Sequence, residues 1–298
     1  MNGHTSSRLL TCLSIFLVLA ISACTAQGGL NLVPPTLTPT PSPTPTATPV
    51  PMAVSVNGEG IPIPEFNAEL ARYQQAQTAL GNTVSLEAAT KAVRDEFIDT
   101  LLLEQAAAAN GYKVDDAALQ SRLDGLDTQI GGPDKLTAWE TAHGYTDADF
   151  RIGLRRQMAA ALMRDRLAAS IPATADQVHV KQILLYNADA AQQALGYLKA
   201  GWNFNDLAAQ YDPVTKGELG WFPRGYLSDS AIENAAFALQ PGQHSDVIQT
   251  QAGYDILFLV ERDPAHLLSP DALLNLQEHA VQNWLTQRRN DSKILFAP

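Results

Sequence analysis

Few side chains of this 298-residue chain are of the types that act as nucleophiles, metal ligands or acid–base groups. The two cysteines, Cys12 and Cys24, lie near the N-terminus, and the six histidines are scattered along the chain. Nowhere do histidine, cysteine and carboxylate residues recur at the spacing of a metal site. Asp212 and Asp255 remain as carboxylates that could exchange a proton with a substrate. We therefore expect no cysteine chemistry, no metal and no other cofactor.

The most regular pattern of glycine and apolar residues lies in residues 216–260. It contains GELGWF at 217–222, AAFAL at 235–239, Pro-Gly at 241–242 and the stretch 247–256. Two strands are predicted at its end, 245–250 and 254–260, separated by a turn at Gly253. This ordered series resembles the parvulin-type peptidyl-prolyl isomerase (rotamase) domain, and the resemblance extends upstream over residues 178–211. It implies a small antiparallel sheet surrounded by helices, and catalysis of cis/trans isomerisation at X–Pro bonds.

Isomerising an X–Pro bond requires no covalent step and no proton transfer. The barrier is the partial double bond of the peptide, about 18–20 kcal/mol. A catalyst must hold the proline ring in an apolar pocket and favour the twisted amide over the planar one. The resemblance places that substrate-binding pocket at Leu219, Leu227 and Ile232, with Phe237 packed behind them. Plain core packing is the competing interpretation for Leu219 and Phe237.

The resemblance also assigns four polar catalytic positions, which are Gln182, Asp212, Thr250 and Asp255. Parvulins carry histidines where this chain has Gln182 and Asp255. His179 does not replace the first of them, because residues 179 and 182 of a regular strand face opposite sides. An ionised Asp255 would repel an electron-rich carbonyl, whereas glutamine can donate and accept hydrogen bonds. We therefore expect weak isomerase activity or none, with peptide binding retained.

The elements before this domain are predicted to be helical. Apolar residues recur at helical spacing through residues 64–169, and Ser85, Asp115 or Asp116, and Thr146 are predicted helix caps. Residues 53–63 are predicted to be extended. The sequences VSVNGE at 54–59 and IPEF at 63–66 resemble the start of the helical chaperone domain of SurA- and PrsA-like proteins.

A last amphipathic helix is predicted from Ser269 to about Arg289. The resemblance implies that this helix packs back on the helical domain, which would make that domain discontinuous, with the parvulin-type domain inserted into it. The predicted fold class is α+β. The predicted boundaries are 53–173 for the helical chaperone domain, 174–264 for the isomerase domain and 265–298 for the C-terminal helix.

The N-terminus has the pattern of a targeting segment. Arg8 precedes an apolar run at residues 9–20, which is too short for a comfortable transmembrane helix. Ile21-Ser22-Ala23-Cys24 resembles the lipobox of bacterial lipoproteins, which implies cleavage after residue 23 and lipidation of Cys24; an ordinary signal peptide is the alternative. The Thr/Pro-rich residues within 24–52 then form a stalk.

Composition narrows the possible partners. The net charge is −11 and the isoelectric point about 4.9, which argues against nucleic acid. The resemblances described above imply a foldase, lipid-anchored to the cell membrane on its extracytoplasmic side, that acts on unfolded or newly exported polypeptides with X–Pro bonds. The alternatives are a non-catalytic holdase that uses the rotamase fold to bind peptides, and a surface protein with one dedicated partner. The sequence predicts no oligomeric state.

Overall fold

The computed structural model describes residues 50–297. The predicted signal peptide, the predicted lipidation site Cys24 and nearly all of the predicted stalk lie outside these residues. Within the described range, no helix is both long and apolar enough to cross a membrane.

The described chain begins in a small antiparallel sheet. Strands β1 (Met52–Val56) and β2 (Glu59–Pro62) form a hairpin whose turn residues Asn57 and Gly58 have φ values of 55° and 94°. Two central residues with positive φ are what a two-residue hairpin turn requires. The third strand, β7 (Ile294–Phe296), comes from the other end of the chain and pairs with β1. The sequence predicted only one extended segment here, so the hairpin and β7 are additions.

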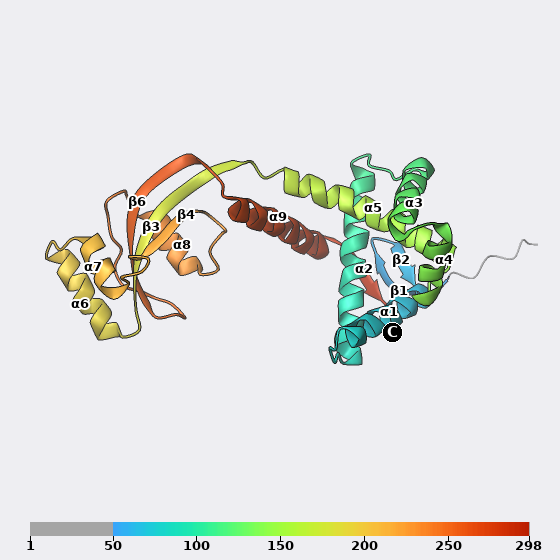
Figure 1. The fold of residues 1–298 in the computed structure, drawn as a ribbon, viewed down its shortest axis with the longest axis horizontal. Coiled ribbons are helices and arrows are strands. Elements are labelled where there is room, and N and C mark those ends of the chain that lie inside the picture. The colour runs from blue at the N-terminus through green and yellow to red at the C-terminus, as the bar shows by residue number, and fades with distance from the viewer. Residues whose placement is uncertain (1–49, 298) are drawn as a thin grey trace, which may run out of the picture. The chain divides into compact units, whose positions relative to one another are not determined.

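Five helices follow, as the apolar spacing predicts (Figure 1). Three of them begin at the predicted caps: the Ser85 hydroxyl accepts from Ala88 N, the Asp115 carboxylate from Ala118 N, and the Thr146 hydroxyl from Asp149 N. These bonds satisfy backbone donors that have no partner within the first turn. The helices are α1 (Ile63–Ala79), α2 (Leu86–Ala109), α3 (Asp116–Ile130), α4 (Pro133–Ala142) and α5 (Asp147–Ala169).

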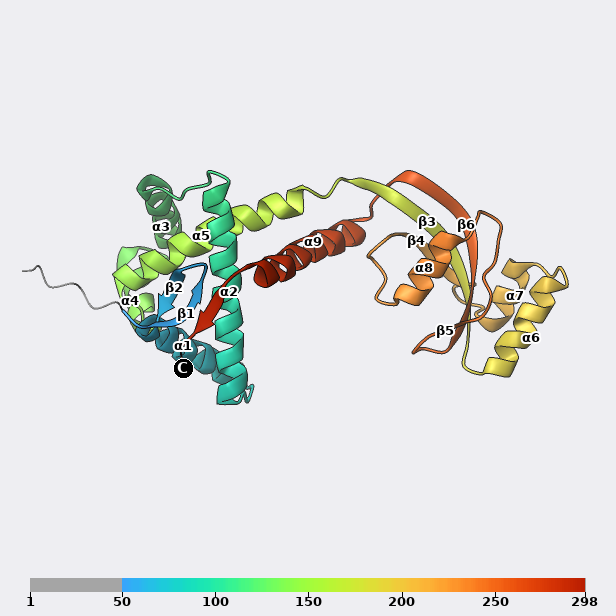
Figure 2. The same ribbon diagram turned by 180° about the vertical axis from the view of Figure 1, so that it is seen from behind.

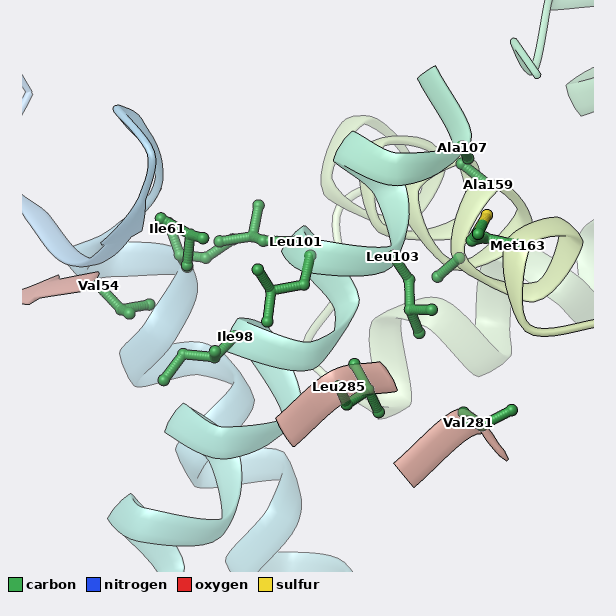
Figure 3. Close-up of a cluster of buried hydrophobic side chains, with 13 residues drawn as sticks. Val54, Ile61, Ile98, Leu101, Leu103, Ala107, Ala159, Met163, Val281 and Leu285 are labelled. Atoms are coloured by element: carbon green, nitrogen blue, oxygen red, sulfur yellow. The ribbon is translucent and has the colours of Figure 1, made fainter. Parts of the chain in front are cut away.

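The core of the helical region is built around α2. Figure 3 shows buried side chains from β1, β2, α2, α5 and the C-terminal helix α9 (Pro270–Asp291) gathered in one cluster. Val281 and Leu285 of α9 belong to this core, and the Arg289 guanidinium donates to Asp99 of α2 at 2.7 Å. The last helix therefore packs against helices that precede it by more than a hundred residues.

The remaining residues form a four-stranded antiparallel sheet in the order β4-β3-β6-β5. One face is covered by α6 (Ala188–Lys199) and α7 (Phe204–Tyr211), and the other by α8 (Ser230–Ala238) (Figures 1 and 2). Each face has a buried apolar cluster of its own. The strands are β3 (Thr174–Leu185), β4 (Glu218–Pro223), β5 (Ile248–Gln249) and β6 (Tyr254–Leu267).

Two strand predictions need correction. The predicted strand 245–250 is reduced to Ile248–Gln249. At Ser245 the side-chain hydroxyl, in place of a backbone carbonyl, accepts from Leu257 N at 2.9 Å. The predicted strand 254–260 continues to Leu267, because residues 261–267 stay paired with the extended start of β3. The antiparallel sheet flanked by helices is otherwise as expected.

Candidate functional site

The four predicted pocket residues come together on the α8 side of the sheet. Leu219 lies on β4, Leu227 on the loop before α8, and Ile232 and Phe237 on α8 itself, and all four belong to one apolar cluster. Ile232 and Phe237 are 8% and 5% exposed, so they serve mainly as the floor. Leu219 and Leu227 are only half-buried and retain surface for a ligand.

Local hydrogen bonds hold Leu227 at the edge of this cluster. The Asp229 carboxylate caps α8 by accepting from Ala231 N at 2.9 Å, and Glu233 of α8 accepts from Gly225 N at 2.8 Å. The loop that carries Leu227 is thereby fixed to the helix at both of its ends. An ordered loop lets an apolar side chain bind without first losing much conformational entropy.

Gln182 lies on β3 on the same face as this cluster. It is paired with Leu257 of β6, and Leu257 and Val180 are both cluster members. Its backbone is fixed by a hydrogen bond from Gln182 N to Gly217 O of 2.7 Å. Gly217 has a φ of 73°, and a Cβ there would lie 2.1 Å from Gln182 O, so only glycine fits. The first residue of the GELGWF motif thus lets the chain pass close to Gln182.

Asp255 of the neighbouring strand β6 is hydrogen-bonded to Thr250, which lies in the turn between β5 and β6. The Thr250 hydroxyl donates to Asp255 Oδ2 at 3.1 Å, and Asp255 is 4% exposed. Asp255 is two residues from Leu257 on β6, so it shares the face of Gln182. Burial raises the pKa of Asp255, the Thr250 hydrogen bond opposes this, and the nearby Asp229 charge adds to the rise. The site therefore favours the neutral carboxylic acid more than the sequence alone suggested.

Replacing Asp255 with asparagine should stabilise the fold at pH 7 by about 1 kcal/mol, the scale of an unsatisfied buried polar group. The carboxyl has a raised pKa in the folded state and an ordinary value of 3.8 when unfolded. Between these values only the folded state keeps the proton, so stability falls as pH rises through the folded pKa. The gain from Asp255→Asn should be present at neutral pH and disappear below pH 3.8.

Urea unfolding at several pH values measures this effect, with the exposed Asp165→Asn as the matched control. A gain that is equal at pH 7 and at pH 3.5 would contradict a titrating Asp255.

Asp212 behaves differently from the other three polar positions. It ends α7, and its Oδ1 accepts from Val214 N and Thr215 N, each at 3.0 Å. The Thr215 hydroxyl also donates to this carboxylate, and this bond is the main cause that lowers the pKa of Asp212. Among the described residues, the side-chain hydrogen bonds of Asp212 all stay within its own turn. Its evident role is to shape the turn after α7.

His179 lies on the opposite face of the sheet from Gln182. Its neighbours in sequence, Val178 and Val180, point into the α8-side cluster. The imidazole instead stacks on Trp221 at 5.4 Å between ring centroids, and its Nε2 lies 2.5 Å from a Glu218 carboxylate oxygen. Register shifts occur on both sides of Val180 but do not bring His179 to the other face.

A cavity of about 790 Å³ opens next to Thr250. It is lined by residues 228–230 before α8 and by residues 249–252 between β5 and β6. Its wall includes Asp229, which the sequence prediction missed. A serine–aspartate–serine run before an apolar helix is a visible cap signal, but its proximity to Asp255 depends on the packing of α8 on the sheet. Within residues 50–297, no three histidine, cysteine or carboxylate side chains are grouped to hold a metal ion.

Residues 173–273 match the family model of the PPIC-type peptidyl-prolyl isomerase domain, and residues 46–137 match that of the SurA-like N-terminal domain. The foldase protein PrsA of Bacillus subtilis is 28% identical over 169 residues, which cover 53% of this chain and 57% of that protein. The chaperone SurA of Methylobacillus flagellatus is 28% identical over 211 residues, which cover 58% of this chain and 47% of that protein. A crystal structure of PrsA from Bacillus cereus is 22% identical, with a TM-score of 0.44, and the alignment covers 81% of this chain and 86% of that one.

The alignments with these two curated relatives span less than two thirds of the relatives' lengths. The two family matches nevertheless show that a SurA-like N-terminal domain is followed by a PPIC-type domain, so the expected resemblance and fold class are confirmed. Helix α5 and most of α9 lie outside both matches, and these are the helices that complete the core around α2.

Proposed function

We propose that this chain is a protein-folding factor of the PrsA/SurA type whose PPIC-type domain isomerises X–Pro bonds in unfolded, newly exported polypeptides. The observation that carries the proposal is the shared face of Leu219, Leu227, Gln182 and Asp255, in a domain that matches a peptidyl-prolyl isomerase family. A half-buried apolar edge beside hydrogen-bonding side chains is suited to holding a prolyl amide while it twists.

The chemistry follows from the differences between the planar and the twisted amide. The proline ring would rest against Leu219 and Leu227, and this contact removes water from the amide. A twisted amide has less resonance, so its carbonyl oxygen is less negative and its nitrogen is a better hydrogen-bond acceptor. Gln182 offers an amide donor, and the raised pKa of Asp255 lessens the charge that would repel the carbonyl oxygen. Stabilisation of the twisted state over both planar states accelerates isomerisation in the two directions equally.

Isomerisation of a panel of X–Pro tetrapeptides by the full chain tests this proposal. Acceleration that saturates with peptide concentration supports it. Absence of acceleration, together with suppressed aggregation of an unfolded client, would instead support a non-catalytic holdase. The replacement of both parvulin histidines, by Gln182 and Asp255, is the observation that favours this second function.

We also propose that Cys24 is lipidated and that the Thr/Pro-rich segment holds the folded region above the extracytoplasmic face of the cell membrane. The support is the apolar run at 9–20 followed by Ile21-Ser22-Ala23-Cys24. Cells that express the chain and are fed radiolabelled palmitate should label it, and Cys24→Ser should abolish the label. Labelling that persists in the variant would contradict this anchor.

A further inference from the structure

Two cavities in the helical region share Phe150 as a lining residue. The first, of about 260 Å³, lies between α1, α2 and α5. The second, of about 330 Å³, lies between α3, α4 and the start of α5. Phe150 lines both of them, so the two cavities are neighbours with one shared wall. The helices that form them are grouped together in Figures 1 and 2.

The first cavity has an excess of negative charge. Its lining holds four carboxylates against two guanidinium groups, those of Arg72 and Arg156. Arg72 is paired with Glu69 at 2.8 Å and Arg156 with Glu65 at 2.6 Å, so both cations are already neutralised. Glu96 is exposed at the rim and has no ion-pair partner among residues 50–297.

The lining of this cavity combines apolar side chains with a buried hydroxyl, that of Thr100, which makes only one long hydrogen bond among the described residues. Phe97, Phe150 and Leu154 supply the apolar part. Thr100 is 4% exposed, and its one side-chain hydrogen bond within the described chain is a 3.5 Å contact from Gln157. That length is at the limit of a hydrogen bond, so the buried hydroxyl can still accept from a ligand. A lysine or arginine side chain fits such a cavity, because its stem is apolar and its end is a charged donor.

The second cavity is apolar. It is lined by Leu126, Ile130, Leu136, Trp139 and Phe150, with the amide of Gln129 as its polar lining side chain. Trp139 is 38% exposed, although its ring packs 6.0 Å from that of Phe150. An exposed tryptophan at the mouth of an apolar cavity is suited to contact an aliphatic or aromatic side chain.

We propose that the helical region binds extended polypeptide segments in which an apolar or aromatic side chain stands near a lysine or arginine. The apolar side chain occupies the second cavity, which Trp139 lines, and the basic side chain occupies the first cavity, which Glu96 lines. The excess of carboxylates around the first cavity favours a basic side chain over an acidic one. The net charge of the whole chain, −11, acts in the same direction. This inference rests on the proposed folding role but is independent of isomerase activity.

Fluorescence anisotropy with the full chain tests the proposal on three labelled, proline-free peptides. One contains phenylalanine and arginine separated by glycine, the second has glutamate in place of the arginine, and the third has serine in place of the phenylalanine. The first peptide should bind most tightly. Glu96→Gln should weaken it about 2- to 5-fold, the scale of one partly exposed ion pair. Glu87→Gln, with the same charge change at an exposed site on the same helix, should leave it unchanged.

Tryptophan emission provides a second readout for the apolar cavity. The first peptide should change the emission of the parent chain, and Trp139→Phe should remove most of that change while keeping an aromatic wall. Equal binding of the three peptides, an equal effect of Glu87→Gln and Glu96→Gln, or an unchanged emission response in Trp139→Phe would each overturn the proposal. Because the peptides lack proline, failure here leaves the isomerase proposal standing.

Discussion

Truncation of Leu227 to alanine should lower catalysed X–Pro isomerisation about 10- to 100-fold while the domain stays folded. Leu227 is half-buried at the edge of the apolar cluster, on a loop fixed by Asp229 and Glu233. A leucine side chain buried by a ligand contributes about 2–3 kcal/mol of apolar contact. Much of this contact is made only when the proline ring is held against the pocket, and each 1.4 kcal/mol lost from the transition state is about tenfold in rate.

The measurement is kcat/KM for an X–Pro tetrapeptide, compared between the parent chain, Leu227→Ala and Leu267→Ala. Leu267 is 68% exposed at the end of β6, so the same truncation there should leave the rate unchanged. Far-ultraviolet circular dichroism checks that both variants are folded. Full activity in Leu227→Ala, or an equal loss in Leu267→Ala, would show that this apolar edge is not the pocket.

Much of the fold was predictable because its signals are local. Side-chain type and the apolar spacing that follows predict caps at Ser85, at Asp115 or Asp116, and at Thr146. The structure has the expected hydrogen bond at Ser85 and Thr146, and of the two aspartates it is Asp115 that caps. Cap bonds join residues three apart, so the sequence contains nearly all of the information that they need. Asn203 makes a bond of the same local kind at the start of α7, where its side chain accepts from Asn205 N.

Features that depend on distant segments were not predictable in this way. Strand β7 has three residues, too few for an alternating pattern, and it exists because it pairs with β1 some 240 positions earlier. Residues 245–250 were expected to form one strand, and nothing in their pattern shows that the Ser245 hydroxyl accepts from Leu257 N and that the strand is limited to Ile248–Gln249. In both cases the partner, not the segment itself, decides the structure.

The candidate site shows the same division. The pocket residues lie together because Leu219, Leu227 and Ile232 are held by one strand, one short loop and one helix. The polar positions came from the family resemblance, which assigned Asp212 and Asp255 the same catalytic role. The structure distinguishes them: the side-chain hydrogen bonds of Asp212 stay in its own turn, whereas Asp255 is buried beside Thr250. That burial also raises the pKa of Asp255, which the sequence could not show because desolvation depends on the packing around the carboxyl group.

The second large effect concerns stability: Leu285→Ala should destabilise the helical region by about 2–5 kcal/mol, the range for truncating a buried leucine. Leu285 is 6% exposed and packs in the core around α2. Its loss leaves a cavity between segments that are joined in sequence only through the whole PPIC-type domain. We propose that α9 is part of the helical folding unit, in which case the loss should lower the unfolding midpoint of that unit.

Urea unfolding of the full chain measures this effect, and Leu274→Ala supplies a matched truncation on the same helix at a site that is 56% exposed. The control should change stability by less than about 0.5 kcal/mol. A similar small change in Leu285→Ala would mean that α9 adds little to the core and that residues 53–173 fold without it. A large change would mean that the helical unit is completed only after the PPIC-type domain has been made, because its last helix follows that domain in the chain.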